Sequence, residues 1–472
     1  MLTYDFTNVD VPIYEYLYRC IKNDILAGNL KPGDKLPSKR SFAHNHGIST
    51  ITIQNAYDQL ISEGYVNTLP RKGYYVAELE VAAVSRVSAD VSYSIILPGP
   101  ADDYLYDISS NGINPDNFPF SVWAKTMRYV MSEEKEKLME ISPSGGVRAL
   151  REAIASHLQS FRGMLVDPDQ IVIGAGTEYL YGILVQLLGK NKRFVIENPG
   201  YKKLVSIYQQ WGVDCGFADM DSNGASAQEL SRAGADVAHI CPNHHFPTGI
   251  TMPASRRYEI LSWANEKAGR YILEDDYDSE FRASGRPVPT LFSVDGCERV
   301  IYMNTFSKSL SPTIRISYMV LPIHLATRFY QSMSFQACTV SNFEQYTLAR
   351  FIQQGSFEKH INRMRLYYIR QRKKLMDTIR LSSLGDCCRI LENDSGLHFL
   401  LQLKTTLTDA QVENEAKKQG LKIKALSDYY LSEEKKRQGY YLVNYSNLND
   451  DTINAALKIL ADLLRKEGRS IS

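Results

Sequence analysis

The sequence predicts two modules: a small N-terminal module of three helices and a β-hairpin, and a larger C-terminal α/β domain with a mostly parallel sheet. The chain has 472 residues, which exceeds one ordinary domain. Its first eighty residues contain three short helical patterns and one alternating pattern. From about residue 105, short apolar runs alternate with helical stretches, which is the order typical of α/β folds.

The first three elements are helices with recognisable ends. Apolar residues recur every four positions over residues 13–25, which makes one apolar helix face, and a glycine follows. Ser38 comes after a Pro-Gly turn and is the expected cap of a short second helix. Ser49 is the expected cap of a third helix. A glycine ends each of these two helices as well.

Residues 65–79, YVNTLPRKGYYVAEL, alternate apolar and polar positions around a basic tip, which predicts a hairpin. Three helices followed by a hairpin form a winged helix-turn-helix, a DNA-binding fold whose third helix enters the major groove. Side chains early in that helix are expected on base edges, and basic side chains on phosphates. The base-reading candidates are Thr50, Thr52, Gln54 and Asn55; the phosphate candidates are Lys39, Arg40, Arg71 and Lys72; Ser38, Ser49 and Gly73 complete the predicted interface.

Composition limits the possible partners. The chain is 44 % hydrophobic and 23 % charged, and its net charge of +1 gives no global attraction to nucleic acid or membrane. DNA binding must therefore come from a local patch. Residues 11–76 hold eight Lys or Arg and five Asp or Glu. Because this excess is small, we expect double-stranded DNA to be bound by a dimer on two half-sites.

The sequence favours a cytoplasmic protein. Its N-terminus has acidic residues where a signal peptide needs a basic start, and no stretch approaches the roughly 18 apolar residues of a membrane span. The seven cysteines are odd in number and mostly scattered, and Cys387 and Cys388 are adjacent. Reduced thiols are the simplest interpretation.

We expect residues 1–77 to form the first module, 78–104 a linker punctuated by Pro-Gly-Pro, and 105–472 the second module.

In the second module, functional side chains gather where predicted strands end, which is where α/β sheets bind ligands. GAGTEY at 174–179 lacks the third glycine of a dinucleotide loop, which argues against such a site. Lys308 follows a strand, Asp275 ends another with Tyr277 two residues later, and Asn243 ends a third. Gly176 and Thr177 begin a helix, where backbone N–H groups can hold a phosphate.

Four groups together indicate pyridoxal 5'-phosphate held as a Schiff base: a lysine amine, a phosphate site with an arginine, a buried carboxylate and an aromatic ring that can stack on the cofactor. In this interpretation Lys308 forms the imine and Asp275 pairs with the pyridine nitrogen. Tyr277 and Asn243 bind the ring hydroxyl, and Tyr201 stacks on the ring. The phosphate is assigned to Arg315, Thr305, Gly176 and Thr177. The acidic cluster at 275–280 could suggest a metal, but a capped turn is the simpler interpretation, so no metal site is predicted.

Residues 11–77 resemble the GntR class of bacterial regulators, through PIYEYLYRCIKNDILAGNLKPGDKLPSKR, the helix beginning at Ser49 and the RKGYYV wing. The remainder resembles fold-type I aminotransferases, through ENPGY, EDDYDSEFR, NTFSKSLSPTIR and HINRMRLYYIRQR. The whole chain is similar to the MocR subfamily of GntR-type regulators. That resemblance implies a transcription regulator that binds pyridoxal phosphate, forms a head-to-tail homodimer and uses its aminotransferase-like domain as a sensor, not as an enzyme.

The sequence departs from this family where an effector carboxylate would bind. Aminotransferases usually carry an arginine in a late strand, but the corresponding residues 439–448 have none. Lys203 stands where the family has a basic residue just after the PGY tyrosine. A lysine offers a carboxylate a single point charge, whereas an arginine would offer two parallel hydrogen bonds. The effector therefore stays open between an amino acid, an amine and pyridoxal phosphate itself. An active aminotransferase that carries a DNA-binding domain is the alternative.

Overall fold

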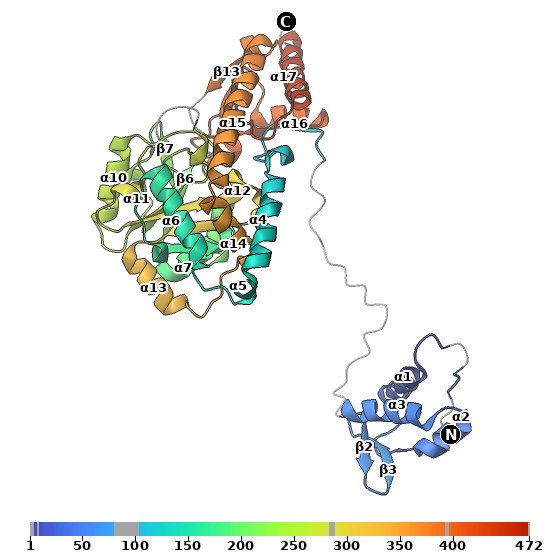
Figure 1. The fold of residues 1–472 in the computed structure, drawn as a ribbon. Coiled ribbons are helices and arrows are strands. Elements are labelled where there is room, and N and C mark those ends of the chain that lie inside the picture. Colours follow the sequence, from blue (N-terminus) through green and yellow to red (C-terminus); the bar gives the residue numbers. More distant parts are fainter. Residues whose placement is uncertain (1–3, 7–8, 80–102, 283–287, 392–395, 471–472) are drawn as a thin grey trace. The chain divides into compact units, whose positions relative to one another are not determined.

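A computed structural model describes residues 4–6, 9–79, 103–282, 288–391 and 396–470. The chain divides into two compact units, residues 1–100 and 101–472 (Figure 1). Most of the linker expected at 78–104, residues 80–102, lies outside the described residues.

The first unit is a winged helix, as predicted. Its core is formed by residues of all three helices, including Leu17, Ile21, Ile53 and Leu60, each with no exposed surface. A three-stranded antiparallel sheet has the order β1-β3-β2, and the short β1 strand was not predicted. The elements are α1 (Ile13–Leu26), β1 (Lys35–Leu36), α2 (Lys39–His46), α3 (Thr50–Ser62), β2 (Val66–Leu69) and β3 (Gly73–Val76).

The second unit is built on an eight-stranded sheet of order β5-β12-β11-β10-β9-β6-β7-β8. Its five central strands are parallel, whereas β12, β5 and β8 add antiparallel pairings, so the prediction of a mostly parallel sheet is confirmed. The strands are β5 (Ile171–Gly174), β6 (Phe194–Asn198), β7 (Cys215–Asp221), β8 (Gly224–Ala225), β9 (Val237–Ile240), β10 (Tyr271–Asp275), β11 (Val300–Thr305) and β12 (Ser317–Val320).

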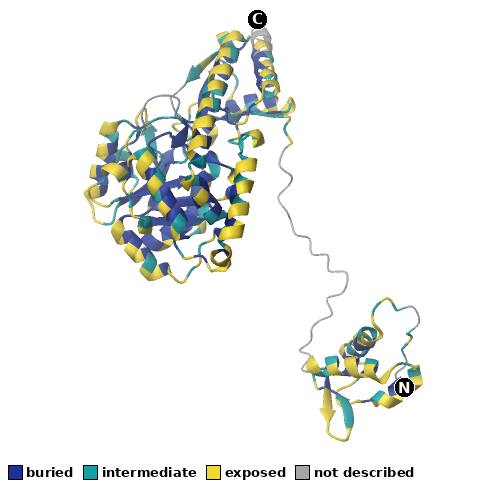
Figure 2. Ribbon diagram, viewed as in Figure 1, coloured by how far each residue is buried: buried dark blue, intermediate teal, exposed yellow. Residues whose placement is uncertain are grey.

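Helices cover both faces of this sheet, because neighbouring residues along each strand are apolar on opposite sides. Ile196, Leu273 and Ile301 pack with residues of α7 and α8, whereas Ile272 and Val300 pack with α10 on the other face. Figure 2 shows the buried strands inside a shell of more exposed helices. The helices are α4 (Phe120–Glu133), α5 (Lys135–Met139), α6 (Arg148–Arg162), α7 (Thr177–Leu188), α8 (Lys203–Gln210), α9 (Ala227–Arg232), α10 (Ala254–Asn265), α11 (Leu291–Val294), α12 (Phe306–Ser309), α13 (Ile323–Met333), α14 (Asn342–Gln353) and α15 (Ser356–Leu381).

A smaller antiparallel sheet of order β13-β14-β17-β16 follows α15. A parallel pairing of β15 with β4 ties the start of the second unit to this C-terminal part. The elements are β4 (Tyr106–Asp107), β13 (Cys388–Leu391), β14 (His398–Leu403), α16 (Asp409–Lys418), β15 (Leu421–Lys422), β16 (Lys424–Ala425), β17 (Tyr440–Asn444) and α17 (Asp450–Ser470).

The direction of β12 brings distant segments together. It runs antiparallel between β11 and β5, so its first residue, Ser317, pairs with Thr305 on one side and with Gly174 on the other. The residues just before β12 therefore meet both the end of β11 and the end of β5. Arg315 lies in that segment, between the turn after Lys308 and the loop that begins α7.

Candidate functional site

The third helix of the winged-helix unit presents a polar outer face. Ser49 caps α3, since its Oγ accepts a hydrogen bond from the Thr52 amide at 3.3 Å. Thr50, Gln54 and Asn55 are exposed, as base-reading residues must be. The Gln54 amide is already engaged: its Oε1 accepts from Lys39 Nζ at 2.9 Å and its Nε2 donates to Asp58 at 3.3 Å.

The predicted phosphate contacts lie at the start of α2 and at the wing tip. Ser38 caps α2 by accepting from the Ser41 amide at 3.1 Å, which places Lys39 and Arg40 in its first turn. Arg71 and Lys72 are exposed between β2 and β3, and Gly73 follows them with a φ of +117°. The first unit therefore carries basic side chains on two segments that flank the core of the module.

In the second unit, Lys308 lies on the short helix that follows β11. Its amine donates to the carbonyl oxygen of Asn111 at 3.0 Å. Burial lowers the pKa of this amine to about 8, although the nearby Asp278 carboxylate acts in the opposite direction. A lysine with such a depressed pKa is a good nucleophile near neutral pH.

Asp275, at the end of β10, has one occupied and one open oxygen. Oδ2 accepts from the Tyr181 hydroxyl at 2.9 Å and lies 3.3 Å from His239 Nε2. The other ring nitrogen of His239 lies 2.9 Å from the Tyr208 hydroxyl. Oδ1 is buried and has no hydrogen-bond partner among the described residues. Buried carboxylate oxygens are normally paired, so this oxygen is available to a cationic ligand.

Two of the predicted phosphate residues, Gly176 and Arg315, lie close together. Gly176 has a φ of +93°, and a Cβ there would lie 2.4 Å from Arg315 Nη2, so only glycine allows the guanidinium this close to the start of α7. Thr177 begins that helix. Thr305 is the N-cap of α12, and its hydroxyl lies in a chain with Ser307 and Ser317. The Thr305 hydroxyl thus hydrogen-bonds to neighbouring hydroxyl groups.

Lys203 is not isolated, contrary to what its proposed effector role would suggest. Its amine forms a close ion pair with Glu178 in the first turn of α7. The other Glu178 oxygen lies 3.6 Å from Arg315 Nη2. The Lys203 ammonium also lowers the pKa of the Glu178 carboxyl. One carboxylate therefore bridges the two cations that sequence reasoning assigned to anionic ligands.

Tyr277 joins a buried cluster on the same edge of the sheet. Its hydroxyl lies 3.2 Å from His244 Nδ1, which is also 2.8 Å from Asp278. His244 Nε2 is buried without a partner among the described residues. The adjacent His245 instead contacts the Thr248 hydroxyl and lies beside Glu197. His244 is therefore the histidine at this site.

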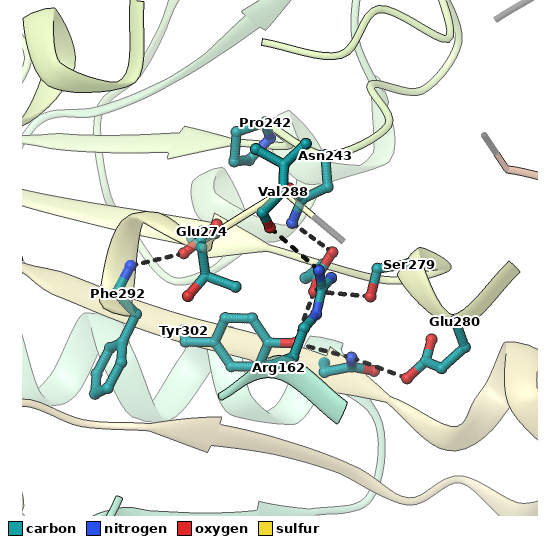
Figure 3. Close-up of polar contacts among 12 residues, drawn as sticks. Arg162, Pro242, Asn243, Glu274, Ser279, Glu280, Val288, Phe292 and Tyr302 are labelled. Carbon is teal, nitrogen blue, oxygen red and sulfur yellow. Dashed lines mark hydrogen bonds and ion pairs between the residues drawn. The ribbon is translucent and has the colours of Figure 1, made fainter. Parts of the chain in front are cut away.

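Asn243 lies in a hydrogen-bond network of its own, and its role as a ligand of the ring hydroxyl stays a prediction, since its Nδ2 carries a second N–H donor. Its Nδ2 donates to Asp276 at 2.8 Å and its Oδ1 accepts from Arg257 at 2.9 Å. The buried network around the carboxylate of Asp276 includes Arg162, Ser279 and Tyr302, which Figure 3 labels together with Asn243. That carboxylate also accepts from Tyr302 at 2.7 Å, from Ser279 at 2.8 Å and from Arg162 in a close ion pair. Both polar ends of Asn243 are thus used inside the protein.

Tyr201 is half-exposed on the loop before α8, and its ring meets Phe246 edge to face with centroids 6.2 Å apart.

Among the described residues no group of His, Cys, Asp and Glu side chains is arranged to hold a metal. Within the same ranges no helix is long and apolar enough to cross a membrane. Sequence reasoning missed Glu178, Tyr181 and His239, since a residue inside a helix or strand gives no sign of the site it faces.

Comparison with known proteins matches both units. Residues 13–76 match the family "Bacterial regulatory proteins, gntR family", and residues 107–436 match "Aminotransferase class I and II". The HTH-type transcriptional regulator YdeL of Bacillus subtilis is 36 % identical over 89 % of this chain and 90 % of its own. The probable rhizopine catabolism regulatory protein MocR of Rhizobium meliloti is 31 % identical over 96 % and 94 %.

Among solved structures, a multiple substrate aminotransferase from Thermococcus profundus matches with a TM-score of 0.68 at 21 % identity. The match covers 79 % of this chain and 93 % of that one. At this identity the likeness shows the fold of the second unit alone. The fold-type I aminotransferase fold expected from the sequence is thereby confirmed.

Proposed function

The chain belongs to the MocR subfamily of GntR-type transcription regulators, and we propose that its aminotransferase-like unit binds pyridoxal 5'-phosphate on Lys308 as a sensor. One observation carries this proposal. A half-buried lysine amine with a lowered pKa shares the carboxyl edge of the sheet with a buried carboxylate oxygen that has no hydrogen-bond partner among the described residues. The first group suits an aldehyde, and the second suits a protonated pyridine nitrogen.

Each residue has a stated role in this proposal. Pyridoxal 5'-phosphate, when bound, supplies an aldehyde and an electron-withdrawing ring. Lys308 would hold the aldehyde carbon, and Asp275 Oδ1 would keep a proton on the ring nitrogen. Tyr277 and Asn243 would bind the ring hydroxyl, and Tyr201 would cover the ring. Arg315 and the backbone N–H groups at Gly176 and Thr177 would hold the phosphate.

The regulator function follows from joining this sensor to a DNA-binding unit in one chain. The sensor can change DNA binding only if its ligand states differ in their contacts with the rest of the protein. We propose a head-to-tail homodimer acting in the cytoplasm, with an amine, an amino acid or pyridoxal phosphate as effector. The ion pair of Lys203 with Glu178 argues against Lys203 as a free binding group for an effector carboxylate.

We propose that the unit is a sensor and not an enzyme, since residues 439–448 lack the arginine that orients a substrate carboxylate in aminotransferases. Orientation of the substrate supplies much of an enzyme's rate. Sustained formation of a keto acid from an amino donor and 2-oxoglutarate, over many turnovers, would contradict this part of the proposal.

Borohydride reduction tests the cofactor site directly. The full-length protein is mixed with pyridoxal 5'-phosphate, reduced, digested and mapped by mass spectrometry. We expect one phosphopyridoxyl group on Lys308, none in Lys308→Ala, and unchanged labelling of Lys308 in Lys203→Ala. Labels spread over several surface lysines, or no label at all, would overturn the assignment.

A further inference from the structure

The recognition helix carries one large apolar side chain on its outer face. Ile51 is 71 % exposed, the highest value among the large hydrophobic side chains described in the first unit. It lies in the first turn of α3, which Ser49 caps. The core side of the same helix is formed by Ile53, Ala56 and Leu60, all fully buried, so Ile51 points the opposite way.

The neighbours of Ile51 make this exposure meaningful. A single exposed hydrophobic residue needs no explanation by itself. Here, however, its neighbours on the outer face are Thr50, Gln54 and Asn55, which are polar. Gln54 lies one turn away and its amide is held by Lys39 and Asp58. The phosphate candidate Lys39 is thus in direct contact with this face. Thr50, Ile51 and Asn55 are exposed beside it.

We propose that Ile51 reads the 5-methyl group of thymine in the DNA major groove. This inference rests on the proposed function, since it requires α3 to enter DNA. Thymine is distinguished in the major groove by that methyl group, and apolar side chains recognise it by contact. The Ile51 side chain has no hydrogen-bonding atoms, so it can contact the methyl group without desolvating a polar group of its own. Asn55, one turn further along, would pair with adenine. The two side chains together select A·T-rich half-sites.

Deoxyuridine scanning tests the proposal, because deoxyuridine is thymidine without the methyl group. A duplex is first enriched from a randomised library by the full-length protein. Each thymine is then replaced singly by uracil, and affinity is measured for wild type, Ile51→Ala and Leu26→Ala. Leu26 is the matched control, since it is also an exposed aliphatic residue, at 50 %, on a helix not expected to touch DNA.

Loss of one buried methyl contact corresponds to about a fourfold weaker affinity. We expect wild type and Leu26→Ala to lose about that factor at one or two thymines per half-site, and Ile51→Ala to lose nothing at those positions. Circular dichroism would verify that Ile51→Ala stays folded. No uracil effect in wild type, or an equal effect in Ile51→Ala, would overturn the inference. Failure of wild type to enrich any duplex would contradict the DNA-binding proposal itself, and this inference with it.

Discussion

The amine of Lys308 must lose its proton before it can attack an aldehyde. Burial lowers its pKa to about 8, whereas the pKa of an unperturbed lysine is about 10.4. The fraction of neutral amine therefore rises as pH increases through about 8 and is nearly complete above about 9. We predict that the rate of pyridoxal 5'-phosphate attachment follows this profile.

Stopped-flow absorbance between about pH 6 and about pH 10 measures this rate. Lys203→Ala is the control, since Lys203 is exposed and its pKa is raised by Glu178. Its profile should match wild type, whereas Lys308→Ala should show no fast phase. A rate that still rises tenfold per pH unit at the alkaline end would contradict the lowered pKa.

At the residue scale, the sequence predicts which residue types gather, but not where every side chain points. The sequence predicts Asp275 and Lys308 at one site because Asp275 ends an apolar strand and Lys308 follows another, and parallel strands share one edge. Asn243 follows a strand in the same way, yet its amide turns inward to Arg257 and Asp276. Arg257 comes from α10, and its burial depends on tertiary packing that no short sequence pattern encodes.

The first turn of α7 is the element that decides how anions bind. Glu178 lies there, paired with Lys203 and 3.6 Å from the Arg315 guanidinium. A phosphate bound at Arg315 would meet this carboxylate as a like charge. We therefore predict that Glu178→Gln strengthens binding of pyridoxal 5'-phosphate by about threefold, the scale of an exposed ion pair.

Two matched measurements isolate the charge effect of Glu178. Pyridoxal, which lacks the phosphate, should bind Glu178→Gln and wild type equally well. Glu152 is an exposed carboxylate on α6 that pairs with Arg148 of the same helix. Glu152→Gln should change neither the affinity for pyridoxal nor the affinity for pyridoxal 5'-phosphate. Equal gains for pyridoxal and its phosphate would show that Glu178 acts on something other than the phosphate.

Elements with strong local signals agree with the sequence predictions. The caps at Ser38 and Ser49 and the hairpin after α3 follow from residue types that favour those positions whatever surrounds them. The antiparallel direction of β12 carries no such signal, because a short buried apolar strand reads the same in either direction. That strand is what brings Arg315 beside Gly176, so the sequence predicts that both residues bind the phosphate but does not show how they come to lie together.

At the scale of the whole molecule, we propose that one chain links the ligand state of Lys308 to DNA binding. Such coupling is reciprocal, so a ligand that alters DNA affinity must have its own affinity altered by DNA by the same factor. The two units are separate compact bodies in the chain, and the coupling needs no shared core.

The most direct measurement is the DNA affinity of the full-length protein by fluorescence anisotropy. It is made without ligand, with pyridoxal 5'-phosphate, and with pyridoxal 5'-phosphate plus a mixture of amines and amino acids. We predict that at least one ligand condition shifts the affinity of wild type by about fivefold or more, the lower end of typical allosteric coupling, and leaves Lys308→Ala unchanged. Equal DNA affinity in all three conditions, or an equal shift in Lys308→Ala, would contradict a sensor built on Lys308.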